Sequence, residues 1–275
     1  MIPDGSIESS HILFLSRILN LFFEYEQEKN NRDNQHNNRY EMHYELPYDF
    51  GKRFAEYLFH LHDSNFQDYI NLLRIGCEKM PSFIDSLLLY VAVVAERKGE
   101  IEIYWKLWHQ LSKTVQDIAL ELANTNFDTQ ESDKRKLIRG MLHADLDWQR
   151  IDYENADISL GKDLILEFVE NAGQNCDVFE SLASLMYHFP AIFCKSGLPI
   201  LAKHQKEDGS NRLLSSNTAF YLEMAIQRFL QSENTGSLPK KLHESCFILL
   251  NAIIETASSR AYYLREHLIR SRKIV

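Results

Sequence analysis

The most constraining feature of the sequence is a helical period of apolar residues that recurs along most of the chain. In its clearest instance the apolar residues are Tyr104, Leu107, Trp108, Leu111, Val115, Ile118 and Leu122. Residues three, four and seven apart share one face of an α-helix, so this spacing predicts an amphipathic helix with one buried side. No stretch alternates with period two for long enough to predict a strand. The 36 leucines against 7 valines also favour helices over sheets.

Short polar segments separate the periodic stretches and mark where helices begin and end. Ser64 to Gln67 has the pattern of a capping box, and Pro81 suits a first helical turn. Gly99 and Gly173 each follow a periodic run, where a left-handed C-cap favours glycine. The expected helices lie near residues 8–29, 48–62, 65–79, 82–98, 101–124, 131–143, 160–172, 176–188, 191–205, 211–231, 239–256 and 259–271.

Short connections between amphipathic helices make consecutive helices antiparallel. The sequence therefore predicts an all-α protein of serial antiparallel helical hairpins, either α-solenoid-like or a compact, right-handed multi-helix array. Two stretches are expected to be loops, the Asn-rich residues 30–38 and the acidic residues 145–157 with Trp148. The second loop would divide an N-terminal half, 1–144, from a C-terminal half, 145–275, within one continuous helical-repeat unit.

The net charge of −9 repels phosphate backbones, so no nucleic-acid partner is expected. The most basic stretch contains Arg260, Arg265, Arg270, Arg272 and Lys273, and we interpret it as a helix C-terminus whose dipole favours cations. No apolar run is long enough to cross a bilayer, so no membrane association is expected.

The cysteines Cys77, Cys176, Cys194 and Cys246 are far apart, mostly in apolar surroundings, and form no CxxC pair. Reduced, buried thiols and a cytoplasmic location are therefore expected. No nucleotide loop of the GxxxxGK(S/T) or GxGxxG type, no HExxH and no GxSxG occurs, so no cofactor or metal is predicted.

Two helical enzyme classes remain as alternatives. A metal-dependent phosphohydrolase would use His62 and Asp63 with His43 and Asp145, but His62–Asp63 abuts the capping Ser64 and is better explained as a turn. An HEPN-like ribonuclease would pair an arginine with a histidine that follows it after four to six intervening residues. Arg53 with His60 and Arg260 with His267 match that spacing, as chance alone also predicts.

Trp105 and Trp108 are candidates for a partner-binding aromatic pair, because Trp is enriched in interface hot spots. Trp108 lies on the apolar stripe and is expected in the core. Trp105 flanks the stripe, so its role stays open.

Several segments occur in a suggestive order. They are Trp105–Trp108 in a long helix, the Trp148 segment, Phe189–Leu198, Asn217–Glu223 and Ala257–Glu266. Over residues 50–275 this order resembles the C-terminal helical-repeat region of large bacterial STAND-type antiviral NTPases. The resemblance implies a sensor that binds a phage protein or other subunits of a larger assembly. It carries over no catalytic residue, so the sequence favours a non-catalytic protein-interaction module, with the ribonuclease as the alternative.

Overall fold

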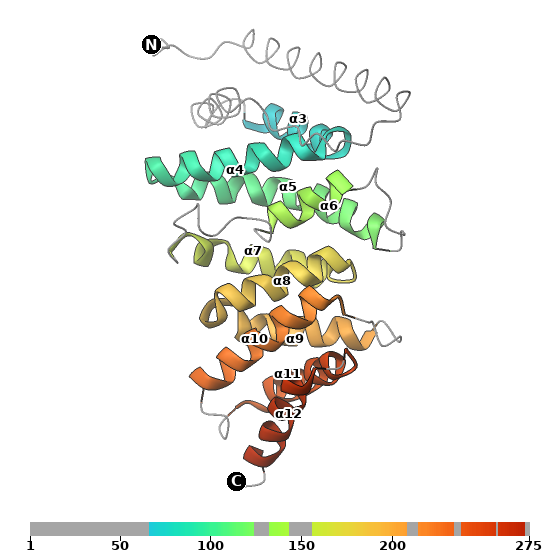
Figure 1. Ribbon diagram of the computed structural model, residues 1–275. Helices are drawn as coiled ribbons and strands as arrows, with labels where there is room; N and C mark the ends of the chain where they lie inside the picture. The colour runs from blue at the N-terminus through green and yellow to red at the C-terminus, as the bar shows by residue number, and fades with distance from the viewer. Residues whose placement is uncertain are drawn as a thin grey trace, which may run out of the picture. The chain divides into compact units, whose positions relative to one another are not determined.

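The computed structural model is all-α, as the sequence predicts. It describes residues 66–123, 132–142, 156–207, 214–233, 238–256 and 258–272, and every regular element in those ranges is a helix (Figure 1). The helices are α3 (Phe66–Lys79), α4 (Pro81–Lys98), α5 (Ile101–Leu122), α6 (Ser132–Met141), α7 (Ala156–Ala172), α8 (Cys176–His188), α9 (Pro190–Glu207), α10 (Ser216–Ser232), α11 (Lys240–Ile254) and α12 (Ser259–Arg272). The expected helices at 8–29 and 48–62, and the expected loop at 30–38, lie outside the described residues. So does the expected loop at 145–157 as far as residue 155, but its last two residues are helical, because α7 begins at Ala156, four residues before the expected start at 160.

The chain divides into two compact units, each described by itself. The first comprises Met1–Thr114 with Gln130–Leu137, and the second comprises Val115–Thr129 with Ile138–Val275. The boundary expected at residues 144 and 145 falls outside the described residues and stays a prediction.

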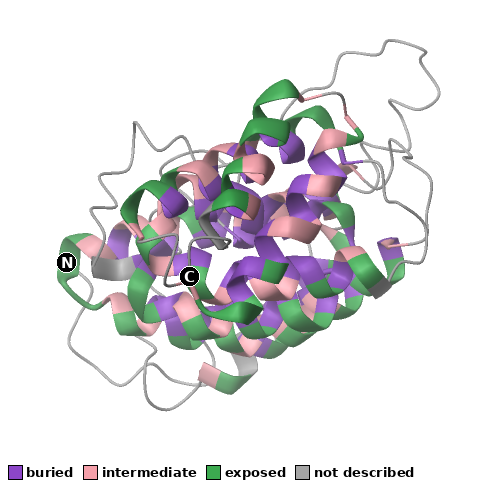
Figure 2. Ribbon diagram, turned by 90° about the horizontal axis from the view of Figure 1, so that it is seen from below, coloured by how far each residue is buried: buried purple, intermediate pink, exposed green. Residues whose placement is uncertain are grey.

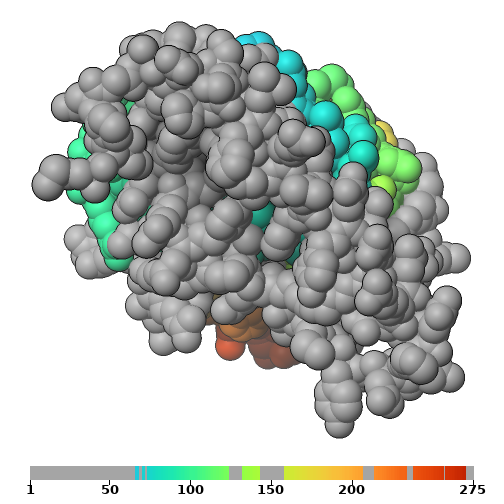
Figure 3. Space-filling view, turned by 90° about the horizontal axis from the view of Figure 1, so that it is seen from above, coloured from blue at the N-terminus to red at the C-terminus, as the bar shows by residue number. Residues whose placement is uncertain are grey.

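In the first unit, α3 packs against α4, and part of α3 is visible at the surface in Figure 3. Pro81 occupies the first turn of α4, and Gly99 ends that helix in the left-handed conformation with φ of 68°, both as predicted. Trp108 is fully buried, as expected for a core residue. Trp105 is also buried, with its ring centroid 5.0 Å from that of Tyr104. It therefore belongs to the packed interior and offers no exposed aromatic surface.

The second unit is built from helical hairpins whose consecutive members are antiparallel. His243, early in α11, lies 3.3 Å through its Nε2 from the carbonyl of Leu268, late in α12. Farther along the same pair, Arg265 donates to Asn251 over 3.1 Å. Contacts between successive helices therefore run in opposite directions along the chain, as short connections require.

Helices two apart in the second unit also pack together, namely α7 with α9, α8 with α10, α9 with α11 and α10 with α12. The α8–α10 pair is parallel, because Glu180 meets Ser215 at one end and Tyr187 meets Arg228 at the other. Antiparallel neighbours with parallel next-but-one helices define the two layers of an α-solenoid. We call α8, α10 and α12 the even-helix layer.

Most helices of this unit bury one side and expose the other, whereas α8 is enclosed and exposes only its first residue, Cys176. Figure 2 shows the buried residues, in purple, toward the interior and the exposed residues, in green, on the outside. Asn175, which is fully buried, caps α8 by accepting from the N–H groups of Asp177 and Val178. Its amide nitrogen also donates to the carbonyl of Ala119 over 2.9 Å, which ties the start of α8 to the last turn of α5. The Asn175 side chain thus caps the start of α8 and holds it against α5.

Three sequence expectations need correction. Helix α10 begins at Ser216, later than expected, because the hydroxyl of Ser215 caps it by accepting from the N–H of Thr218. Gly173 does not adopt a left-handed conformation; it is required because the ring of His204 lies where a Cβ would project. Cys176 is exposed rather than buried, because it is the first residue of α8 and lies at the exposed end of that helix.

Candidate protein-binding surface

The structure describes one of the two arginine–histidine pairs that match the ribonuclease spacing. Arg53 and His60 lie outside the described residues. Arg260 and His267 are both exposed on α12, two turns and about 10 Å apart along the helix axis. The Nε of Arg260 lies 3.3 Å from a carboxylate oxygen of Glu223, so this guanidinium holds α12 against α10. The pairing of Arg260 with His267 in catalysis stays a prediction.

No group of three or more His, Cys, Asp or Glu side chains suited to hold a metal ion occurs in the described part of the chain. Within the same residues, none of the helices combines the length and apolar character that crossing a membrane demands. Burial raises the pKa of the Cys77, Cys194 and Cys246 thiols to about 12, so these three are not poised as nucleophiles.

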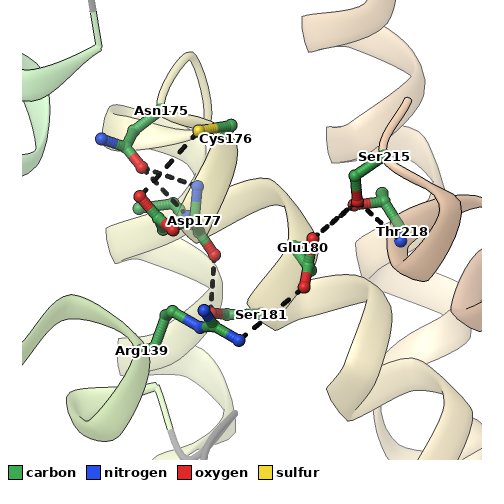
Figure 4. Close-up of polar contacts among 9 residues, drawn as sticks. Arg139, Asn175, Cys176, Asp177, Glu180, Ser181, Ser215 and Thr218 are labelled. Atoms are coloured by element: carbon green, nitrogen blue, oxygen red, sulfur yellow. Dashed lines mark hydrogen bonds and ion pairs between the residues drawn. The ribbon is translucent and has the colours of Figure 1, made fainter. Parts of the chain in front are cut away.

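A polar contact around Glu180 joins α8 to the start of α10 (Figure 4). One carboxylate oxygen of Glu180 accepts from the hydroxyl of Ser215 over 2.8 Å and from that of Thr218 over 2.9 Å. Its other oxygen lies 3.8 Å from a guanidinium nitrogen of Arg139 on α6. Thr218 is buried, and Ser215 caps α10, so the carboxylate fixes where α10 begins relative to α8.

Two turns beyond Glu180 on α8, Tyr187 lies at the centre of a ring cluster. Its ring centroid is 5.8 Å from that of Phe220 and 5.7 Å from that of Tyr221, and those two are themselves 5.8 Å apart. Interplanar angles of 39° to 63° place the rings in the tilted and edge-on arrangements that aromatic pairs favour.

Arg228, two turns along α10 from Tyr221, completes the cluster. Its guanidinium carbon lies 4.4 Å from the centroid of the Tyr187 ring, and its Nη1 donates to the carbonyl of Tyr187 over 2.8 Å. Stacking and a hydrogen bond together fix the side chain across the end of α8. We call Tyr187, Phe220, Tyr221 and Arg228 the aromatic–arginine cluster.

The cluster is exposed although its rings touch one another. Phe220 keeps 51% of its surface exposed, Arg228 is exposed, and Tyr187 and Tyr221 are half-buried. The buried stripe of α10 consists of Ala219, Leu222, Ala225, Ile226 and Phe229. Phe220 lies beside that stripe, on the solvent side, so the core does not need it. A large apolar ring outside the core indicates a binding role when others accompany it.

The same layer continues onto α12. Glu223 is only 9% exposed, and its carboxylate accepts from the hydroxyl of Ser258 and pairs with Arg260. Beyond this contact Tyr262 and Tyr263 are 46% and 73% exposed. The guanidinium of Arg265 lies 5.1 Å from the Tyr262 ring, which repeats the pairing of arginine with tyrosine.

The sequence carried a signal for this surface that periodicity alone did not resolve. Phe220 and Tyr263 both fall off the apolar stripe of their helices, as large apolar residues in solvent-facing positions. Tyr187 and Arg228 are 41 residues apart, and their contact depends on the packing of α8 on α10. The off-stripe rings were visible in the sequence, whereas their assembly into a cluster was not.

Comparisons with known proteins add no identification: no family model, no curated protein and no solved structure matches this chain.

Proposed function

We propose that this chain is a non-catalytic protein-interaction module that binds a protein partner through the aromatic–arginine cluster of its even-helix layer. One observation carries the proposal: three rings and a stacked guanidinium form a contiguous, exposed cluster outside the apolar stripe of α10. Tyr and Arg are enriched among the interface residues that dominate binding energy.

The cluster is held in place before any partner binds. The Glu180 contact fixes α8 against α10 below the rings, and the Glu223 contact fixes α12 against α10 beside them. Each side chain that is already ordered lowers the entropic cost of association by about 0.5–1.5 kcal/mol. Rings fixed by their neighbours are therefore well suited to act as anchors.

We further propose that the module serves as the sensor-like part of a bacterial antiviral NTPase system and recognises a phage protein or a subunit of that system. The segments Asn217–Glu223 and Ala257–Glu266, two of those on which the resemblance rests, contain Phe220, Tyr221 and the exposed tyrosines of α12. A cytoplasmic location is part of this proposal, supported by three buried cysteine thiols that suit a reducing compartment.

Affinity capture tests the proposal. The tagged full chain is used as bait in the cells that produce it, with and without phage infection, and captured proteins are identified by mass spectrometry. Phe220→Ala, which removes a ring that is 51% exposed, is compared with Leu160→Ala on α7, where the side chain is 56% exposed outside the cluster.

The expected result is a stoichiometric protein partner that Leu160→Ala retains and Phe220→Ala loses. A hot-spot ring contributes at least about 2 kcal/mol, which weakens the complex roughly thirtyfold. A partner that both variants retain equally would place binding elsewhere and contradict the proposal.

A further inference from the structure

The charge of the second unit changes sign from its first helix to its last. Helix α7 carries four acidic residues and one lysine, whereas α10 and α12 together carry five arginines and two glutamates. The chain as a whole has a net charge of −9. Helix α8, which carries Tyr187, adds Asp177 and Glu180, but Asp177 is 9% exposed and Glu180 contacts Ser215, Thr218 and Arg139. The surface formed by α10 and α12 is therefore mainly basic on an acidic protein.

The two glutamates of that surface do not offset its positive charge at the cluster. Glu223 is nearly buried, where it pairs with Arg260 and accepts from Ser258. Glu266 lies 3.5 Å from a guanidinium nitrogen of Arg265. The contacts of Arg228 with Tyr187 are to a carbonyl and a ring, and neither group carries a formal charge.

On the basis of the proposed function, we infer that the partner presents an acidic segment whose carboxylates contact Arg228 and the arginines of α12, and whose apolar or aromatic side chain packs on Phe220. Carboxylates pair with guanidinium groups in two parallel hydrogen bonds, and a ring beside them completes the match to an exposed aromatic. Arg228 and Arg270 are both exposed, so each is accessible to a carboxylate without displacement of a core residue.

The remaining charge of the protein favours a peptide over a nucleic acid. Repulsion from a net charge of −9 grows with the charge of the ligand, and a single strand adds one negative charge per nucleotide. A peptide with two or three carboxylates meets the local arginines at a much smaller long-range cost. The faces of the rings already contact one another and Arg228, so the cluster suits the packing of a side chain better than the stacking of bases.

The probe is a short fluorescent copolymer of glutamate and tyrosine with about three carboxylates per molecule, compared with a lysine–tyrosine copolymer of the same length and with a thymidine oligonucleotide. Binding to the full chain is followed by fluorescence anisotropy at several salt concentrations. The variants are Arg228→Glu and Arg270→Glu, with Lys203→Glu as the matched control, an exposed cation on α9 whose charge change is the same. Arg270→Glu provides a second test, because Arg228 also bonds to α8 and its loss can disturb packing.

The expected result is binding of the glutamate–tyrosine copolymer that weakens about tenfold in each arginine variant, weakens with salt, and is unchanged in Lys203→Glu. Equal loss in Lys203→Glu would indicate charge attraction without a site and overturn the inference. Tighter binding of the lysine–tyrosine copolymer would overturn it too, and tighter binding of the oligonucleotide would assign the surface to nucleic acid.

The inference and the proposed function fail separately. If the captured partner is lost with Phe220→Ala but binds both arginine variants as well as the unchanged protein, the inference of an acidic segment is wrong and the proposed binding surface stands. If binding of the copolymer depends on both arginines, but a captured partner binds the Phe220→Ala variant as well as the unchanged protein, the proposed function is wrong.

Discussion

Replacing Gly173 with alanine tests a close packing contact in the second unit. An added Cβ would lie 2.5 Å from Cδ2 and 2.6 Å from Nε2 of His204, and 2.6 Å from the carbonyl oxygen of Val169. Carbon atoms in favourable contact are about 3.5–4.0 Å apart, so the methyl group overlaps its neighbours by about 1 Å. His204 is 5% exposed, and Val169 contributes backbone, so neither atom moves away cheaply.

The expected cost is large for a single methyl group. Overpacking a close-packed interior costs about 1–3 kcal/mol, and the backbone contact places Gly173→Ala near 2–3 kcal/mol. For a chain of this size that corresponds to a fall of roughly 5–10 °C in the thermal midpoint. Urea unfolding followed by circular dichroism would give the free energy, and the thermal scan would give the midpoint.

Two other glycines serve as controls with different physical causes. Gly197→Ala meets the flexible Met186 side chain at 2.9 Å inside α9, where alanine gains up to about 1 kcal/mol of helix propensity, so little net change is expected. Gly99→Ala has open space but a φ of +68°, and the left-handed backbone alone should cost about 1–2 kcal/mol.

A double variant identifies the clash itself. Removing the His204 ring should relieve part of the overlap, so Gly173→Ala with His204→Ala should lose less stability than the sum of the two single variants, by about 1 kcal/mol. Strict additivity, or an unchanged midpoint in Gly173→Ala, would refute the view that this glycine is required by the ring.

Three further predictions concern the even-helix layer. Glu180→Ala should lower the free energy of unfolding by about 2 kcal/mol in urea, because Thr218 loses a charged acceptor, whereas Glu180→Gln should retain most of it. In the native protein a thiol reagent should modify Cys176 first, since it is the exposed cysteine, and the other three thiols only on unfolding; rapid modification of a second thiol would contradict the packing. Burial, and then the charge of Arg228, lower the pKa of His188 below its ordinary 6.5, so the unfolded chain binds more protons there and stability should be lost as pH falls below 6.5. The fall in thermal midpoint on acidification should be smaller in His188→Gln; identical pH profiles would contradict this.

The helices themselves were predictable because their information is local. The period that begins at Tyr104 placed α5 within two residues of its bounds, and Pro81 and Gly99 marked the ends of α4. Such features depend on residues within a few turns of one another. Boundaries set by a single side chain were less predictable, and Ser215 starts α10 five residues later than the apolar pattern indicated.

The candidate site was less predictable because it depends on contacts between helices. Trp105 is of a residue type that is enriched in interfaces, but it is buried against Tyr104. Gly173 had the position of a C-cap, yet it is required by His204, a residue of another helix. Period and spacing assign a side chain to a face, and only the packing of helices decides whether that face is covered.

The arrangement of the even-helix layer also explains how such a surface is able to vary without loss of the fold. The polar contacts that align α8, α10 and α12 use Glu180 and Glu223, which are largely shielded from solvent, whereas the rings use Phe220 and Tyr263, which are exposed. Substituting an exposed ring removes little buried apolar area, so it costs little stability. Substituting Glu180 leaves the buried hydroxyl of Thr218 without its charged acceptor, and substituting Glu223 removes the acceptor that holds Ser258 and Arg260 of α12. Under the proposed function, the two glutamates align the helices and the exposed rings contact the partner, so the rings can be substituted at little cost to the packing of the repeat.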